Sequence, residues 1–198
     1  MRLLLDITGG KEKKMKYNEL YKRNSNPDFW DTDEAEHKCN CGSFALNLTT
    51  WFAPYLDESE IENMDDVDAY QYSTYEREHL MEELLWEGYN REDVMDIILE
   101  RDWQFILMTC PWLIPIQRED IRENDRVIAY RLMLEDVDPD GFDADLHTDF
   151  HFRVLINGEW WEKNGASPIR YCGTFADEEP WRCETWVYDS NIKYAKFI

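Results

Sequence analysis

A cysteine at the predicted start of a helix is the residue of this sequence with the most evident chemistry. Residues 38–47 read Lys-Cys-Asn-Cys-Gly-Ser-Phe-Ala-Leu-Asn, so Asn40, a residue type that caps helices, directly precedes Cys41. The unpaired N–H groups and the dipole of a first helical turn favour negative charge, and they lower the pKa of a thiol placed there. We therefore predict a helix over 41–52, closed by Pro54, with Cys41 as a nucleophilic thiolate. A small buried cysteine at a helix start would give the same pattern.

A histidine lies on the clearest predicted strand, residues 150–156. Side chains alternate between the two faces of a strand, so the apolar Phe152 and Val154 share one face and His151 shares the other with Arg153. The apolar face should pack in the core. His151 would then be placed beside a cleft, as a general base requires, or it would be a half-buried strand histidine without chemistry.

The dipeptide at 157–158 sets which residue of the next strand lies near His151. Asn-Gly is the strongest short signal for a two-residue hairpin turn, and it pairs Ile156 with Glu159 in a second strand over 159–163. In that register Glu162 is a diagonal neighbour of His151 on the same face, and Asn164 lies opposite His151. Either side chain could hold the tautomer and orientation of the imidazole. Spacing alone equally allows an ordinary ion pair between Glu162 and Arg153.

These two blocks together resemble a group of bacterial and phage proteins. The blocks are Asn-Cys-Gly-Ser-Phe-Ala-Leu-Asn at 40–47 and Asp-Phe-His-Phe-Arg-Val at 149–154, followed by Asn-Gly-Glu-Trp-Trp-Glu-Lys-Asn-Gly at 157–165. Their order is similar to that of papain-like cysteine peptidases, nearer the bacterial cell-wall peptidase branch. The resemblance implies Cys41 as nucleophile, His151 as base and Glu162 as orienting residue, with Asn164 as the alternative.

The resemblance implies a cysteine-dependent hydrolase, a peptidase or amidase acting on a protein or peptide and needing no cofactor. It covers 25 residues in two blocks, and two features depart from the pattern. Glu162 stands where a second histidine is expected, and no side chain upstream of Cys41 is identified as an oxyanion-hole donor. The backbone N–H of Cys41 is the donor that we expect for the oxyanion.

The charge of the chain suggests a second class of function. Its 198 residues include 43 Asp and Glu against 21 Lys and Arg, a formal net charge of −22. Such a surface repels phosphate backbones and anionic lipid heads, so we expect neither nucleic acid nor membrane as a partner. It suits a basic protein. The alternative to an enzyme is therefore a non-catalytic acidic binding or inhibitor protein on a decayed peptidase scaffold, for example a phage-type mimic of nucleic acid.

An acidic run at 136–147 matches the front of a calcium-binding loop. Asp136, Asp138 and Asp140 would supply oxygen ligands, and Gly141 would allow the sharp turn. The twelfth position, normally a bidentate Glu, is His147. A solvated acidic loop explains the same residues, and we favour it over calcium binding.

The rest of the pattern predicts an α+β fold with helices before strands. Helical spacing occurs at 76–87 and 91–101, and short apolar runs typical of strands occur at 104–110, 126–134, 185–188 and 192–197. We predict a lead-in over 1–37 and a single papain-like domain over 38–198, with the cysteine helix and a helical segment packed on an antiparallel sheet.

The N-terminal apolar run is too short for the core of a signal peptide, and the number of cysteines, five, is odd. We therefore expect reduced thiols and a cytoplasmic location.

Overall fold

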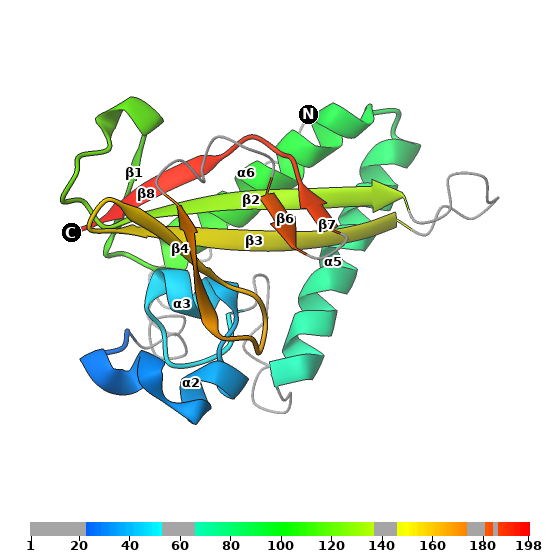
Figure 1. Cartoon of the computed structure of the whole chain (residues 1–198). Helices are drawn as coiled ribbons and strands as arrows, with labels where there is room; N and C mark the ends of the chain where they lie inside the picture. Colours follow the sequence, from blue (N-terminus) through cyan, green and yellow to red (C-terminus); the bar gives the residue numbers. More distant parts are fainter. Residues whose placement is uncertain (1–22, 53–65, 137–145, 174–180, 184–185) are drawn as a thin grey trace.

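An antiparallel sheet forms the centre of the structure, a computed structural model that describes residues 23–52, 66–136, 146–173, 181–183 and 186–198. Its six strands lie in the order β1-β8-β2-β3-β4-β5, and a separate hairpin pairs β6 with β7. The helices gather on one side of the long strands β2 and β3 (Figure 1). The predicted α+β class is confirmed.

The elements follow one another in the order helices, then strands. The helices are η1 (Pro27–Asp31), α2 (Asp33–Lys38), α3 (Cys41–Leu46), α5 (Asp66–Trp86) and α6 (Arg91–Thr109), with η2 (Arg118–Asp120) after the first strand. The strands are β1 (Leu113–Ile116), β2 (Val127–Asp136), β3 (Leu146–Ile156), β4 (Glu159–Lys163), β5 (Ile169–Gly173), β6 (Trp181–Cys183), β7 (Trp186–Tyr188) and β8 (Lys193–Phe197). In this part of the chain, no helix is long and apolar enough to cross a membrane.

Residues 104–110, which we predicted as a strand, continue α6 to Thr109, so that prediction is wrong. Asn90 caps the helix as expected, because its side chain accepts a hydrogen bond from the backbone N–H of Asp93. A short apolar run cannot be assigned to strand or buried helix by periodicity alone. Neither Gly nor Pro interrupts the sequence from 91 until Pro111, so the helix runs on.

The cysteine helix is shorter than predicted and ends at Leu46, not at 52. Asn47 follows in the left-handed conformation, with a φ of 60°, and caps the C-terminus. Asn adopts this conformation more readily than most residues, and the indole N–H of Trp30 donates to its side-chain oxygen at 3.1 Å. The chain then returns, and Phe52 packs against Gly42, where a Cβ would lie only 2.6 Å from the Phe52 ring.

The hairpin between β3 and β4 has the predicted turn and register. Asn157 and Gly158 both have positive φ, 53° and 80°, as a two-residue turn of this kind requires. Ile156 pairs with Glu159, and Arg153 pairs with Glu162. Because β4 ends at Lys163, Asn164 lies just beyond the paired strands.

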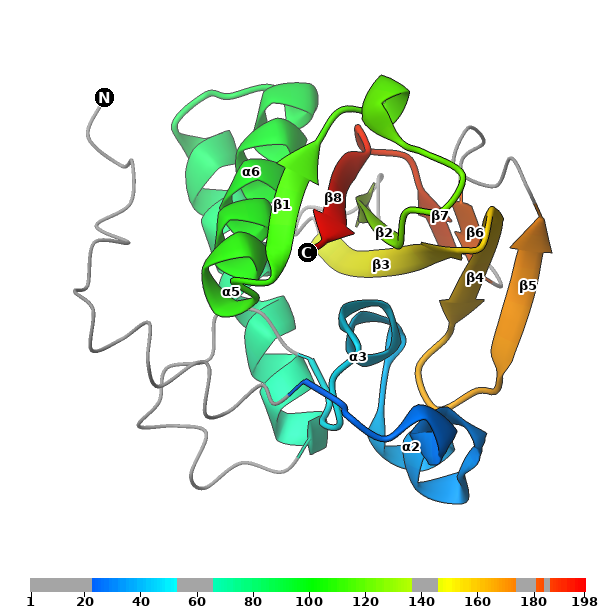
Figure 2. The ribbon, with the colours of Figure 1, turned by 90° about the vertical axis from the view of Figure 1, so that its left-hand side faces the viewer.

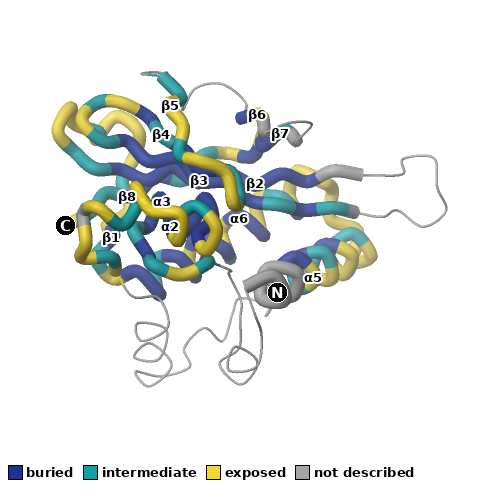
Figure 3. The backbone as a smooth tube through the Cα atoms, turned by 60° about the horizontal axis from the view of Figure 1, so that its bottom comes forward, coloured by how far each residue is buried: buried dark blue, intermediate teal, exposed yellow. Residues whose placement is uncertain are grey.

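Two apolar clusters lie on the two faces of the sheet. Phe150 and Phe152 of β3 belong to the larger cluster, together with residues of α3, α5 and α6. Leu155 belongs to the smaller one, with Trp181 and Tyr188 of the β6-β7 hairpin. Figure 3 shows the continuous buried backbone of β2 and β3 between these layers. His151, which alternates with the two phenylalanines, therefore projects toward the hairpin side.

The described part of the predicted lead-in is attached to the rest of the fold. The backbone N–H of Asn24 donates to the carbonyl oxygen of Asn47 at 2.7 Å. In α2, Ala35 is buried, and the carbonyl oxygen of Glu36 accepts a hydrogen bond of 2.8 Å from the ammonium of Lys163. Residues from 23 onward thus pack against α3 and β4.

Candidate active site

The N-terminus of α3 is fixed by a buried network around its capping residue. The side-chain oxygen of Asn40 accepts hydrogen bonds from the backbone N–H groups of Ser43, at 3.0 Å, and Phe52, at 3.2 Å. The amide of Asn40 donates to the Phe52 carbonyl at 2.7 Å, and Ser43 Oγ accepts from the Asn40 N–H. The predicted cap is confirmed, and Cys41 is the first residue of the helix.

Cys41 packs against the strand that carries His151. Its thiol lies 3.9 Å from the carbonyl oxygen of Phe150, the residue before His151, and the side chain is only 6% exposed. This contact places the N-terminus of α3 beside Phe150 of β3, before the part of the strand that pairs with β4 from Arg153 onward. Figure 2 shows α3 against β3 at this point. The structure thus brings the two sequence blocks into contact.

The ring of His151 is held through one of its two nitrogens. Nε2 lies 3.2 Å from a carboxylate oxygen of Glu162, which can only accept, so Nε2 carries the proton. In the neutral ring Nδ1 is then the acceptor, and it has no hydrogen-bond partner among the described residues. Trp181 and Tyr188 cover the ring, with centroids 6.0 and 5.1 Å away, and leave His151 only 3% exposed.

Glu162 serves as both an orienting residue and an ion-pair partner. Its carboxylate binds His151, the guanidinium of Arg153 at 2.7 Å and the guanidinium of Arg170. Burial would raise the pKa of Glu162, but the hydrogen bond and charge of His151, and then Arg153, hold that pKa well below its usual range. The ionised carboxylate can therefore stabilise an imidazolium at His151.

Asn164, the alternative orienting residue, does not contact His151. Its carbonyl accepts from the Ser167 N–H at 2.8 Å, and its side-chain oxygen is buried without a hydrogen-bond partner in the described part of the chain. The end of β4 at Lys163 explains this, because Asn164 leaves the sheet before it can lie opposite His151.

The environment of Cys41 opposes the predicted thiolate. Burial, followed by the negative charge of Asp149, raises the pKa of the thiol far above its usual range and outweighs the nearby backbone N–H groups. The resting side chain is therefore a neutral thiol. In the described structure no hydrogen bond joins Cys41 to His151. The backbone N–H of Cys41 has no described acceptor, as expected for the first turn of a helix.

A cavity of about 260 Å³ lies between α2 and the end of β4. Three carboxylates and one ammonium line it, with apolar walls from Trp30 and two residues of the β4–β5 connection and β5; the full lining is Trp30, Asp31, Thr32, Asp33, Glu36, Lys163, Pro168 and Ile169. Lys163 follows Glu162 directly on β4, and its side chain points to α2, on the opposite side of the strand from Glu162. The acidic lining of the cavity favours a cationic group.

Three residues that contribute to the site were not predicted from the sequence. Arg170 comes from β5 and Tyr188 from β7, and neither lies in a recognisable motif. Asp149, which accepts a hydrogen bond of 2.7 Å from the Tyr188 hydroxyl, stands two residues before His151 and was visible only as part of the Asp-Phe-His block.

The predicted calcium loop lies mostly outside the described residues, which exclude Asp138, Asp140 and Gly141. Asp136 is the last residue of β2, and His147 belongs to β3, where its Nδ1 lies 3.2 Å from a carboxylate oxygen of Glu78. Among described residues no group of three or more His, Cys, Asp and Glu side chains could hold a metal. Calcium binding stays a prediction.

Comparison with protein families, curated proteins and solved structures finds no match to this chain. The papain-like resemblance therefore depends on the residues of the two blocks alone.

Proposed function

We propose that the protein is a cysteine-dependent hydrolase of the papain-like type, a peptidase or amidase. The observation that carries this proposal is the bonding of His151. Glu162 holds Nε2, which leaves Nδ1 as the acceptor, and the Cys41 thiol packs on the backbone of the same strand, next to the carbonyl oxygen of Phe150. A nucleophile, a base and an orienting carboxylate are the three groups that thiol acyl transfer requires.

In this mechanism the thiol loses its proton as it attacks. The sulfur of Cys41 bonds to the acyl carbon while Nδ1 of His151 accepts the thiol proton, and the Cys41 N–H donates to the developing oxyanion. The imidazolium, stabilised by Glu162, then protonates the leaving amine as the C–N bond breaks. Water, deprotonated by His151, hydrolyses the thioester. Cys41 packs in the larger apolar cluster, whereas His151 projects to the hairpin side of the sheet, and no hydrogen bond joins them. The proposed reaction therefore requires a rearrangement that brings the thiol and the imidazole to the same side of β3.

The cavity beside β4 supports a substrate with positive charge. Asp31, Asp33 and Glu36 line it, and Lys163, which also lines it, donates to the carbonyl oxygens of Glu36 and Gly165. We propose that an Arg or Lys side chain of the substrate enters this cavity while the scissile bond lies at Cys41.

A non-catalytic acidic binding protein is the second candidate. The burial of Cys41 and His151, and the raised pKa of the thiol, favour it, because a structural cysteine and a satisfied core histidine would show the same features. The net charge of −22 would then serve the binding of a basic partner.

A panel of peptide amides separates the two candidates. Peptides with Arg, Lys, Ala or Glu next to the scissile bond are incubated with the parent protein, Cys41→Ala and His151→Gln, and cleavage is measured by mass spectrometry. We expect cleavage of the Arg and Lys peptides by the parent alone. Equal cleavage by Cys41→Ala, or cleavage by none of the three proteins, would support the second candidate.

A further inference from the structure

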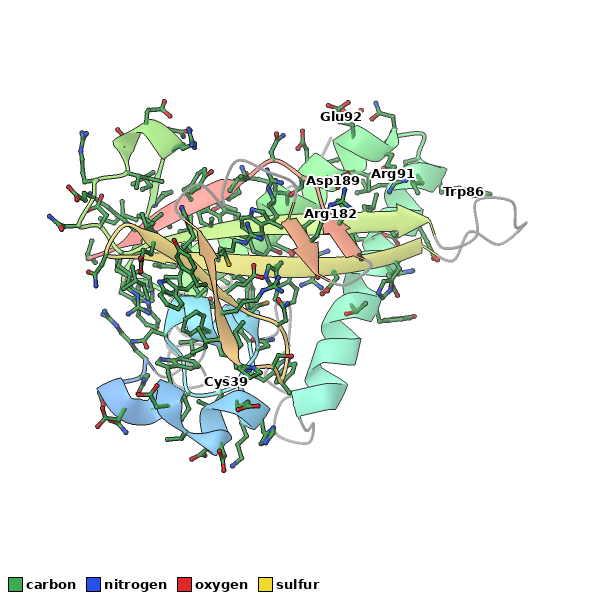
Figure 4. All side chains as sticks on the ribbon, viewed as in Figure 1. Cys39, Trp86, Arg91, Glu92, Arg182 and Asp189 are labelled. Atoms are coloured by element: carbon green, nitrogen blue, oxygen red, sulfur yellow. The ribbon has the colours of Figure 1, made fainter. Side chains whose placement is uncertain are left out.

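A tryptophan at the end of α5 is exposed to an unusual degree. Trp86, the last residue of the helix, is 92% exposed, and Tyr89 in the connection to α6 is 44% exposed. Seven other tryptophans are buried or half-buried: Trp30, Trp51, Trp103, Trp112, Trp160, Trp161 and Trp181. Figure 4 shows Trp86 at the outer edge of the molecule. The packing of this chain does not require an aromatic side chain at this position.

Carboxylates are frequent in the segment that carries these two aromatic residues. In the segment 82–96, which we call the α5–α6 corner, six acidic residues are exposed: Glu82, Glu83, Glu87, Glu92, Asp93 and Asp96. Arg91 is the one Lys or Arg in this segment, and its guanidinium is directed to the carbonyl oxygen of Leu134. Glu82, Glu87 and Glu92 have no ion-pair partner among described residues.

The requirements of the fold explain part of this corner. Glu92 and Asp93 lie in the first turn of α6, where they complement the helix dipole, and Gly88, with a φ of 93°, allows the chain to turn. These requirements do not explain why Trp86 is exposed. Exposed aromatic residues mark interaction sites, and Trp, Tyr and Arg dominate the energetics of protein interfaces.

We propose that the α5–α6 corner is a docking surface for a basic segment of a partner protein. An arginine of the partner stacks on the indole of Trp86, because the π-face attracts a cation. The basic residues next to that arginine in the partner form ion pairs with the carboxylates of the α5–α6 corner. Tyr89 adds apolar contact area. This surface lies on other elements than the candidate active site, so the inference does not rest on the proposed hydrolase.

Fluorescence anisotropy with a labelled octa-arginine peptide tests this surface, because two triple variants can be matched in charge. Glu82→Gln/Glu87→Gln/Glu92→Gln removes three negative charges at the corner. Asp28→Asn/Glu119→Gln/Glu123→Gln removes three exposed charges elsewhere. We expect the corner triple, and also Trp86→Ala alone, to weaken binding about tenfold, and the distant triple to weaken it less than about twofold.

Each outcome decides for or against the corner. Equal weakening by both triple variants would mean that the peptide responds only to net charge. Unchanged binding to Trp86→Ala would mean that the indole does not contribute to binding. Either result overturns the proposal. Thermal melts confirm that all variants fold, which we expect because every substituted side chain is exposed.

Discussion

Glu162→Gln should destabilise the protein more than Glu159→Gln, the same substitution at the other carboxylate of β4. The carboxylate of Glu162 is buried and is shared by His151, Arg153 and Arg170. Removing one partner of a buried ion pair costs about 3–5 kcal/mol, because the other charge is left uncompensated. We expect about 3 kcal/mol here, the low end, because Arg170 is exposed to water and the Gln oxygen can still accept a hydrogen bond.

The lowered pKa of Glu162 also determines how the loss of stability in Glu162→Gln changes with pH. The pKa of Glu162 is lowered on folding, so its contribution to stability is fully present above the pKa in the unfolded chain, about 4.3 for Glu. The contribution is lost as the pH falls from there through the folded pKa. The difference in free energy of unfolding between the parent and Glu162→Gln should therefore be constant above about pH 5 and should shrink below about pH 4.

Urea unfolding at pH 7, pH 5 and pH 3.5, followed by far-UV circular dichroism, measures this difference. Glu159→Gln is the matched control, because Glu159 is an exposed carboxylate on the same strand, and we expect it to change stability by less than about 0.5 kcal/mol. A loss at pH 7 for Glu162→Gln as small as that of the control would refute the buried network as described. So would a difference that grows as the pH falls.

Three further predictions concern the helix start, the thiol and the acidic loop. Asn40→Ala should lower the free energy of unfolding by about 2 kcal/mol, because a helix cap and buried hydrogen bonds to Phe52 are lost; a change below about 0.5 kcal/mol in urea unfolding would contradict this. Alkylation of Cys41 by iodoacetamide, followed by peptide mapping, should rise about tenfold per pH unit from pH 7 to 9, since the thiol has a raised pKa; a plateau below pH 7 would instead indicate a preformed thiolate. If residues 136–147 bind calcium, millimolar calcium should raise the melting temperature, and Asp138→Ala should abolish the rise; no shift in the parent protein would exclude the site.

Local signals in the sequence predicted the parts of the site that depend on neighbours along the chain. The Asn-Gly turn set the register that places Glu162 diagonal to His151, and Asn40 set the start of α3, because both effects act over a few residues. The sequence also predicted that Glu162 would bind either His151 or Arg153. The structure has both contacts at once.

The features that the sequence did not predict depend on packing between residues far apart in the chain. Arg170 reaches Glu162 only because β5 pairs with β4. The pKa of Cys41 depends on burial between α3 and β3, which outweighs the helix terminus on which the sequence argument relied. The apolar run at 104–110 became helix because α6 packs it into the large cluster, where apolar residues suit a helix as well as a strand.

Trapping of the acyl-enzyme tests the central claim most directly. An arginine-containing peptide ester is mixed with the parent protein, the reaction is quenched with acid within seconds, and the protein mass and the modified peptide are determined by mass spectrometry. We predict one acyl group on Cys41 in the parent, none in Cys41→Ala, and a strongly reduced yield in His151→Gln. An unmodified Cys41, an acyl group on Cys172 instead, or the same yield without His151 would contradict the account.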